Sequence, residues 1–355
     1  MHENSNNTGF GSDAQKLMVS RLDIQDEIDW RPEYLAQSAW LEHVPFAFWL
    51  VRALQPRSVV ELGTHWGVSY GAFCQTIERI GLNTRAYAVD TWLGDEHAGA
   101  YGEVVFNTVN SLNEARWKRF STLLRMTFSE ARQYFGTGEV DLLHIDGFHT
   151  YEAVYEDFHL WRETLSECGV ILFHDTNVRE RNFGIWRFWQ ELKSEHPHFE
   201  FFHGHGLGVL GVGEAFPEPL RALFATTEDP AVAAKIRSIF AARGEAVAMR
   251  WTAKDIGEKL KAAEAERDVN RDLLQQTERR AERLNEELHA LVCSNSWRIT
   301  RPLRVVMAVA RGICRSAIKA MDYTRFGASG TEKASGFSRG KRLQGLIRRF
   351  RSSSR

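Results

Sequence analysis

The 355-residue sequence lacks several features that mark specialised classes of protein. It has only four cysteines, Cys74, Cys168, Cys293 and Cys314, and no two of them form a CxxC pair. This scatter argues against a cysteine-bound metal and favours a reducing compartment. No uninterrupted apolar run reaches about 18 residues, so we expect no membrane-spanning helix. A repeat of solenoid period is also missing.

The N-terminal sequence MHENSNNTGFGSDAQ is polar and lacks the basic and then apolar pattern of a signal peptide. A cytoplasmic location is therefore our default expectation, and we expect residues 1–22 to be disordered. With 43% hydrophobic and 26% charged residues, the chain has the composition of an ordinary soluble globular protein.

Acidic residues are scarce in the last part of the chain. Residues 298–355 contain 15 basic side chains against two acidic ones, a net charge of +13. The whole chain has a formal net charge of −1, so the first 297 residues carry −14. An acidic first part joined to a basic tail indicates two separate functions, or one function and a localisation signal.

Apolar segments alternate with helical ones over the first two thirds of the chain. The patterns predict strands at 58–63, 84–90, 121–127, 141–146 and 169–174. After a helix at 183–195, the stretch FEFFHGHGLGVLGVG indicates a closing hairpin. This alternation predicts an α/β fold over residues 23–213, with N-terminal helices and a doubly wound, mostly parallel seven-stranded sheet of Rossmann-like type.

The composition changes after this domain. Residues 214–252 contain proline and alanine and are expected to form a connector with short helices. Residues 253–292 favour a coiled coil, because apolar or small residues recur in steps of three and four. The heptad is imperfect in its middle, where Arg267, Asn270 and Thr277 occupy the seam. A single solvated helix is the alternative.

Residues 293–355 are predicted to form a basic amphipathic tail. The stretch SNSWRITRPLRVVMAVARGICRSAIKAM places apolar residues on one helical face and arginines elsewhere. This pattern is typical of a helix that lies on an anionic membrane surface. Docking on its own protein or on a partner is an equal alternative. The tail shows no nucleic-acid-binding motif, so we expect no nucleic-acid partner.

The stretch VVELGTHWGVSYG, residues 59–71, indicates a buried strand, a glycine-punctuated turn and the start of a helix. The spacing E-x-G-x-x-x-G-x-S is formed by Glu61, Gly63, Gly67 and Ser69. A dinucleotide site needs a middle glycine where this sequence has His65, and a phosphate loop needs a Lys-Ser or Lys-Thr pair. The turn therefore lacks the pattern of a phosphate site.

This loop resembles the first motif of the class I methyltransferases that use S-adenosylmethionine. The resemblance implies that Gly63 and Gly67 let the backbone pass close to the methionine part of the cofactor. It also implies that Ser69 helps to hold the methionine carboxylate at the positive end of a helix. Glu61 would fix the loop or meet the amino group through water. A purely structural strand–helix turn is the alternative.

Two further positions follow from the same resemblance. Asp90 ends the second predicted strand, where the family uses an acidic side chain to accept both ribose hydroxyls. A solvated cap is the alternative for this residue. Ser129 follows the third strand, where the family often contacts the adenine, and a helix N-cap is the alternative.

Asp146 ends the fourth predicted strand and Asp175 the fifth, beside the switch point of a doubly wound sheet. With Thr176 they form an oxygen-rich set suited to Mg²⁺, or to Ca²⁺ or Mn²⁺. The alternatives are a helix cap and an arginine pair. We also place Asp146 in the cofactor-binding set. His149 is the candidate base that removes a hydroxyl proton, with metal ligation or capping as alternatives.

The arrangement resembles the metal-dependent O-methyltransferases, although His149 stands where the catechol type has a lysine base. Thr176 stands where relatives have asparagine or aspartate. The strings DTWLGDEHAGAYGEVVF, LLHIDGFHTYEAVYEDFHLW and ILFHDTNVRERNFGIWRFWQEL resemble a bacterial branch, similar to methyltransferase family 24, that often accompanies glycosyltransferases in polysaccharide assembly. The resemblance implies S-adenosylmethionine and a divalent metal such as Mg²⁺ as cofactors.

Three functions stay open at this point. The first is an O-methyltransferase that modifies a hydroxyl of a cell-surface polysaccharide or its glycan precursor. The coiled coil would make it a homo-oligomer, and the basic tail would bring it to the inner membrane face. The second is a related small-molecule tailoring methyltransferase or hydroxylase. The third is a catalytically weak scaffold that recruits glycosyltransferases, which the joint presence of the predicted site residues argues against.

Overall fold

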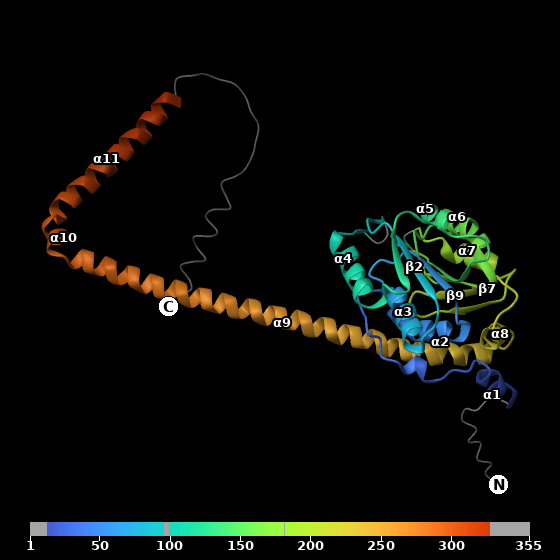
Figure 1. The fold of residues 1–355 in the computed structure, drawn as a ribbon. Helices are drawn as coiled ribbons and strands as arrows, with labels where there is room; N and C mark the ends of the chain where they lie inside the picture. The colour runs from blue at the N-terminus through green and yellow to red at the C-terminus, as the bar shows by residue number, and fades with distance from the viewer. Residues whose placement is uncertain (1–12, 96–98, 181, 327–355) are drawn as a thin grey trace, which may run out of the picture. The chain divides into compact units, whose positions relative to one another are not determined.

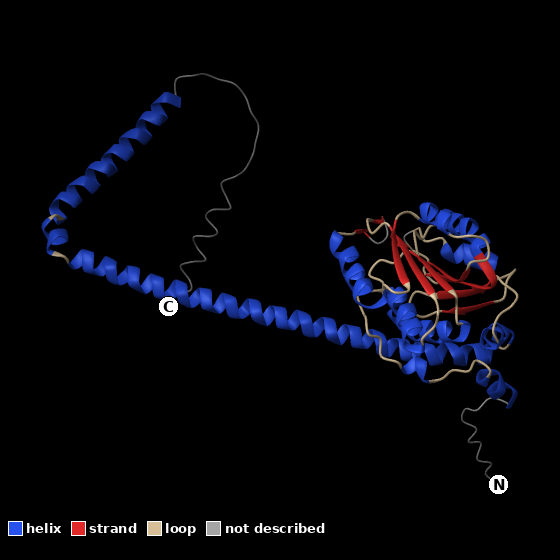
Figure 2. Ribbon diagram, in the orientation of Figure 1, coloured by secondary structure: helices blue, strands red, loops and turns tan. Residues whose placement is uncertain are grey.

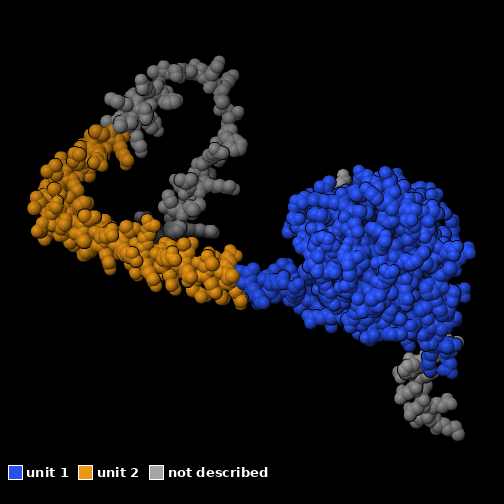
Figure 3. Space-filling view, viewed as in Figure 1, with its two compact units in different colours: residues 1–262 blue, residues 263–355 orange. Residues whose placement is uncertain are grey.

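The computed structural model describes residues 13–95, 99–180 and 182–326. The chain divides into two compact units, residues 1–262 and residues 263–355 (Figure 3). The first unit contains all the strands among the described residues, whereas the described part of the second unit is helical (Figure 2). Each unit is treated by itself below.

A seven-stranded sheet forms the centre of the first unit, with the order β5-β2-β1-β6-β7-β9-β8 (Figure 1). The first five strands in this order run parallel, and β9 is antiparallel to both of its neighbours. The predicted mostly parallel Rossmann-like sheet and its closing hairpin are therefore confirmed. The strands are β1 Ser58–Leu62, β2 Arg85–Asp90, β5 Ser121–Arg125, β6 Val140–Ile145, β7 Leu165–His174, β8 His198–Phe201 and β9 Leu207–Gly211. A separate pair joins β3 Gly94–Asp95 to β4 Gly99–Ala100.

Helices cover both faces of this sheet (Figure 2). Side chains of successive strand residues point to opposite faces, so Val59 packs in one core and Val60 in the other. The larger core includes residues of α2 Val44–Leu54, α3 Val68–Ile80, α4 Glu103–Leu112, α8 Glu218–Ala225 and the beginning of α9 Pro230–Cys293. The smaller core includes residues of α5 Phe128–Ala131, α6 Tyr151–Trp161 and α7 Ile185–Leu192.

The parallel strands bring the predicted acidic residues to one edge. Asp90 ends β2, Asp146 follows β6, and Asp175 follows β7. Since β1 lies between β2 and β6, the glycine loop after β1 is flanked by the ends of those two strands. The carboxyl edge of the sheet is where open α/β sheets bind ligands.

Some predicted boundaries differ from the structure. Residues 13–20 form α1 Asp13–Ser20 within the segment predicted to be disordered, and Leu22 is fully buried. Residues 214–252, described above as a connector, contain α8 and the beginning of α9. Their apolar residues, such as Ile236 and Phe240, belong to the larger core. The sequence alone does not distinguish a helix that covers a sheet from one that leads away from it.

The second unit contains the rest of α9, then α10 Asn295–Ile299 and α11 Arg301–Phe326. The seam residues Leu274, Leu284, Leu288 and Leu291 are each more than half exposed. The coiled coil therefore stays a prediction, since it needs a partner helix. No helix among the described residues combines the length and the apolar character needed to cross a membrane. Residues 327–355 of the predicted tail lie outside the described residues.

Candidate active site

The loop after β1 needs its two glycines for different reasons. Gly63 has φ +90°, and a Cβ there would lie 2.1 Å from the carbonyl oxygen of Asp146. Gly67 has φ +74° and forms the N-cap of α3. Left-handed φ values favour glycine, and the first position also admits no side chain. Gly63 is thus required by the close approach of the β1 and β6 loops, and Gly67 by the left-handed backbone at the start of α3.

Asp90 holds this loop in place. Its Oδ2 accepts backbone N–H groups from Thr64 and His65, each at 2.9 Å, and its Oδ1 accepts the N–H of Trp92 at 2.7 Å. The Trp92 indole in turn donates to the carbonyl oxygen of His65 at 3.0 Å. A carboxylate oxygen has room for more than one donor, so these contacts leave Asp90 able to accept a ligand hydroxyl.

Two polar features at this loop fit the predicted cofactor. Helix α3 follows Gly67 without a side-chain cap, and Val68 and Ser69 of its first turn line a cavity. An uncapped helix start of this kind favours an anion such as a carboxylate. Oε1 of Glu61 is buried and has no hydrogen-bond partner among the described residues. A buried oxygen in that state fits a donor supplied by a ligand or by water.

Two cavities meet at the carboxyl edge of the sheet. The larger has a volume of about 690 Å³, and Gly67, Ser69, His149 and Asp175 are among its lining residues. The smaller, of about 230 Å³, is lined by Asp90, Thr127 and Phe128 among others. Both are bordered by Gly63, His65, Tyr101, Asp146 and Gly147. A ligand that spans the glycine loop can therefore reach both cavities.

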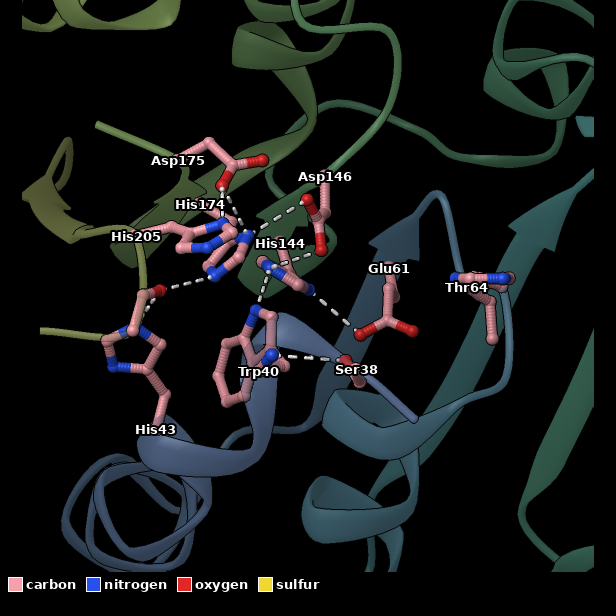
Figure 4. Close-up of polar contacts among 12 residues, drawn as sticks. Ser38, Trp40, His43, Glu61, Thr64, His144, Asp146, His174, Asp175 and His205 are labelled. Carbon is pink, nitrogen blue, oxygen red and sulfur yellow. Dashed lines mark hydrogen bonds and ion pairs between the residues drawn. The ribbon is translucent and has the colours of Figure 1, made fainter. Parts of the chain in front are cut away.

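His174 lies between the two predicted metal-binding carboxylates (Figure 4). Its Nδ1 is 3.4 Å from Oδ1 of Asp146 and 3.5 Å from Oδ1 of Asp175, and its Nε2 is 3.1 Å from the carbonyl oxygen of Gly204. Both ring nitrogens thus face acceptors, as in an imidazolium. Burial alone would lower the pKa of His174, but the two carboxylates raise it well above its ordinary value.

The same contacts stabilise the ionised carboxylates. Burial would raise the pKa of Asp146, but neighbouring His174 and His144 lower it. Burial also opposes ionisation of Asp175, whose pKa is nevertheless lowered by His174, His205 and His149. Nδ1 of His205, from the turn between β8 and β9, lies 3.2 Å from Oδ1 of Asp175. The imidazolium of His174 therefore supplies part of the charge that a bound cation would otherwise provide.

Asp146, His149 and Asp175 each offer one ligand atom, and these atoms lie within 4.8 Å of one another. Two carboxylates and one imidazole fit a divalent cation such as Mg²⁺ or Mn²⁺. Nε2 of His149 is 3.5 Å from Oδ2 of Asp175, and its ring stacks on Phe183 at 4.6 Å between centroids. Thus one nitrogen of the predicted base faces a carboxylate at the cavity.

Two predicted residues lie apart from this group. Thr176 is fully buried and is not among the residues that line the larger cavity. The Thr176 hydroxyl instead packs against Gly206, since a Cβ placed on that glycine would lie 2.7 Å from it. Ser129 is exposed and lines neither cavity. Thr127, and not Ser129, caps α5, where its hydroxyl and the Glu130 side chain form a reciprocal capping box.

The structure adds residues that sequence reasoning left out of the site. Gln37, Ser38, His205 and Trp251 line the larger cavity, and they come from segments far apart in the chain. His174, which lies between the two carboxylates, is a further addition. A clue was present in the sequence, because His174 directly precedes Asp175 at a strand end. Nothing in the sequence marked the other four.

Comparisons with known proteins agree with this geometry. Residues 60–176 match the model of family 24 of the methyltransferases, described as a methyltransferase domain. The chain is 45% identical over 249 residues to the uncharacterized protein y4gI of Sinorhizobium fredii. The aligned part covers 69% of this chain and 27% of that relative. The chain thus spans about a quarter of the length of the curated relative.

Solved structures with a related fold are more distant. A methyltransferase from Geobacter sulfurreducens is 14% identical, with 59% of this chain and 93% of that chain covered and a TM-score of 0.37. The O-methyltransferase TomG of Streptomyces achromogenes, solved with S-adenosylmethionine, is 15% identical, with 59% and 93% covered and a TM-score of 0.37.

The assignment of the domain rests on the family match and on the sheet order of the chain itself. The matched residues contain β1, the glycine loop, Asp90, Asp146, His149 and Asp175. Residues 60–176 are therefore similar to the methyltransferase domains of family 24.

Proposed function

We propose that the domain transfers a methyl group from S-adenosylmethionine to a hydroxyl oxygen of a glycan. The observation that carries this proposal is the meeting of two cavities at Gly63 and Asp146. The smaller cavity offers Asp90 to ribose hydroxyls, and the uncapped start of α3 offers N–H groups to a carboxylate. The remaining part of the larger cavity leaves room for an acceptor beside His149 and Asp175.

His149 has the position of the base in this proposal. It accepts the hydroxyl proton at Nε2, and the nearby carboxylate of Asp175 stabilises the resulting imidazolium. The cofactor supplies the methyl group, and a divalent cation held by Asp146, His149 and Asp175 would supply a Lewis acid. If His149 ligates that cation, the base role passes to another group. The two roles of His149 are separated by the metal experiment below.

The lining of the larger cavity supports a carbohydrate acceptor. Trp66, Tyr101 and Trp251 offer aromatic faces, and Gln37 and Ser38 offer groups that form hydrogen bonds. Sugars present both apolar C–H faces and hydroxyl groups, so this mixture suits them. The polysaccharide role follows from the resemblance alone, and a small-molecule hydroxyl acceptor is the alternative.

The first test is calorimetric titration of S-adenosylmethionine into the protein, with Mg²⁺ and then with EDTA. Saturable binding is expected under both conditions, since neither Asp90 nor the start of α3 belongs to the candidate metal ligands. Methyl transfer to glycan acceptors would then be followed with and without EDTA, in the wild type and in Asp175→Asn. Loss of transfer on metal removal supports the metal role, and absence of cofactor binding contradicts the proposed function.

We also propose that the end of the described chain contacts an anionic membrane surface. Arg298, Arg301 and Arg304 line a cavity of about 390 Å³ at the corner between α10 and α11, together with Trp297. None of these arginines forms an ion pair with a described residue, and no acidic residue occurs between Glu287 and Asp322. Exposed apolar residues of α11, such as Leu303 and Val306, would enter the interface.

This membrane contact is tested by flotation with vesicles of phosphatidylglycerol or phosphatidylcholine. The full chain is expected to float with the anionic vesicles, and replacement of the three corner arginines by glutamine should reduce that flotation. The matched control replaces three arginines of α9, Arg271, Arg279 and Arg280, which removes the same charge elsewhere. Equal loss in both variants would point to net charge alone. The exposed seam of α9 leaves homo-oligomers and glycosyltransferase partners as further proposals.

A further inference from the structure

A series of hydrogen bonds connects Trp40, in the N-terminal segment, through His144 to Glu61 of β1, two residues before Gly63 of the glycine loop (Figure 4). The Trp40 indole Nε1 is 3.1 Å from Nε2 of His144, and Nδ1 of His144 is 2.8 Å from Oε2 of Glu61. All three side chains are buried, with exposed fractions of 0–1%. The Trp40 backbone N–H is itself fixed by the Ser38 hydroxyl at 3.0 Å.

The chemistry of these groups sets the direction of the chain. An indole N–H can only donate, so Nε2 of His144 must accept from Trp40. The proton of a neutral imidazole then lies on Nδ1, which donates to the Glu61 carboxylate. A proton on Nε2 would instead face the indole N–H. Trp40 therefore selects the tautomer of His144 that serves Glu61.

His144 also lies close to a residue of the reaction centre. Its Nε2 is 4.0 Å from Oδ2 of Asp146, the carboxylate that borders both cavities. In the other tautomer, this nitrogen would carry a proton toward Asp146 and leave Glu61 without its donor. The tautomer of His144 thus decides whether its proton lies toward Glu61 or toward the carboxylate of Asp146.

We propose that Trp40 is a positioning residue that fixes the tautomer of His144 and thereby holds Glu61 at the end of β1, two residues before Gly63 of the loop that binds S-adenosylmethionine. The inference rests on the proposed function for the identity of the ligand. It reaches outside the segment that matches the family, because Trp40 lies in the short helix Ala39–His43 and the match begins at residue 60. The neighbouring residues Gln37, Ser38, Ala39 and Leu41 line the larger cavity.

The chain offers a matched pair of tryptophans for the test. Trp49 is fully buried like Trp40, and its indole donates to the carbonyl oxygen of Leu22 at 3.0 Å. Trp40→Phe and Trp49→Phe therefore each keep an aromatic ring in the core and each lose one indole hydrogen bond. Only the first change removes the donor to His144. Both variants would first be checked for folding by circular dichroism.

The first readout is the tautomer of His144, measured by ¹⁵N NMR of the imidazole nitrogens in the protein without ligand. The signal is assigned by its loss in His144→Asn. The wild type and Trp49→Phe are expected to show the Nδ1–H form, and Trp40→Phe is expected to show a mixture. A pure Nδ1–H form in Trp40→Phe would overturn the proposal. This readout needs no cofactor, so it decides the network even if the proposed function fails.

The second readout is the affinity for S-adenosylmethionine. Trp40→Phe is expected to weaken it by about three- to tenfold relative to Trp49→Phe, which corresponds to the loss of one well-placed hydrogen bond. Equal affinity in the two variants would overturn the proposal.

His144→Asn retains an amide N–H near the Nδ1 position and no longer depends on Trp40. In that background, Trp40→Phe should therefore have no further effect, and a full additional loss would contradict the tautomer mechanism. If Trp40→Phe does not fold, the affinities of His144→Phe and His144→Asn for S-adenosylmethionine are compared instead. Only the asparagine variant keeps an N–H donor to Glu61, so the phenylalanine variant should bind more weakly.

Discussion

The two ends of the candidate site hold their carboxylates in different ways. At the end of β2, Asp90 is held by three backbone N–H groups. At the ends of β6 and β7, Asp146 and Asp175 are held by imidazole groups, above all His174. Backbone donors keep their protons, whereas imidazoles can release or exchange theirs. The first end is therefore suited to binding neutral hydroxyls, and the second to proton transfer and charge compensation.

A fourth carboxyl group near the loops, that of Asp157, shows what happens without either kind of partner. Asp157 of α6 lies beside Gly147, because a Cβ placed on Gly147 would be 3.5 Å from Oδ2 of Asp157. Its side chain makes no hydrogen bond or ion pair with a described residue, and burial raises its pKa to about 7. Burial alone thus disfavours the charged form, and the imidazole partners of Asp146 and Asp175 overcome that cost.

The largest effect is expected at the imidazole end. His149→Ala should reduce turnover by about 10²–10⁴-fold, since general-base catalysis contributes that much. Affinity for S-adenosylmethionine should stay within about twofold, because the proposed contacts to the cofactor come from Asp90 and the start of α3. Steady-state kinetics and calorimetry measure the two effects. The matched control is His159→Ala, a change of an exposed histidine on α6. Wild-type turnover in His149→Ala would remove this residue as the base.

The next effect is expected at the backbone end. Asp90→Ala removes a carboxylate that accepts from the loop, and it should weaken S-adenosylmethionine binding by about tenfold or more, as expected for bonds to a charged group. Calorimetric titration measures the change. Asp90→Asn keeps one acceptor oxygen and should fall between Asp90→Ala and the wild type. Unchanged affinity in Asp90→Ala would show that this end does not bind the ribose.

The last effect is expected in the stability of the fold, not in binding or turnover, and concerns Asp157. Its pKa in the folded state, about 7, lies above the ordinary value of 3.8. Between these values the unfolded chain is ionised while the folded chain keeps the proton, so stability falls as pH rises from about 4 to 7. Asp157→Asn should remove that fall and stabilise the protein at pH 8 by up to about 4 kcal/mol.

Thermal unfolding of Asp157→Asn and the wild type at pH 4 and pH 8 measures this effect. The two proteins should have similar Tm values at pH 4 and differ at pH 8, where the variant is more stable. Glu163→Gln is the control, because it removes a charge from an exposed position next to α6. An equal Tm difference at both pH values would contradict the raised pKa.

The sequence by itself determined the sheet, the glycine loop and the acids at the strand ends. Alternating apolar and helical segments fix a parallel sheet, and the ends of its strands must share one edge. Asp146 and Asp175 were identified from their positions at strand ends, His149 from its chemistry beside them, and Asp90 with the help of the family resemblance. The structure places all four on the two cavities. The patterns depend on short-range periodicity, which a single chain displays directly.

Only the tertiary structure decided which partner each acid receives. His205 comes from the turn between β8 and β9, and Trp40 comes from a segment more than 100 residues before His144. Ser129 and Thr176 carry suitable groups at suitable positions in the sequence, yet they do not line the larger cavity. The physical reason is that hydrogen bonds act over about 3 Å. Their partners are set by strand register and helix packing across the whole domain, which local sequence does not specify.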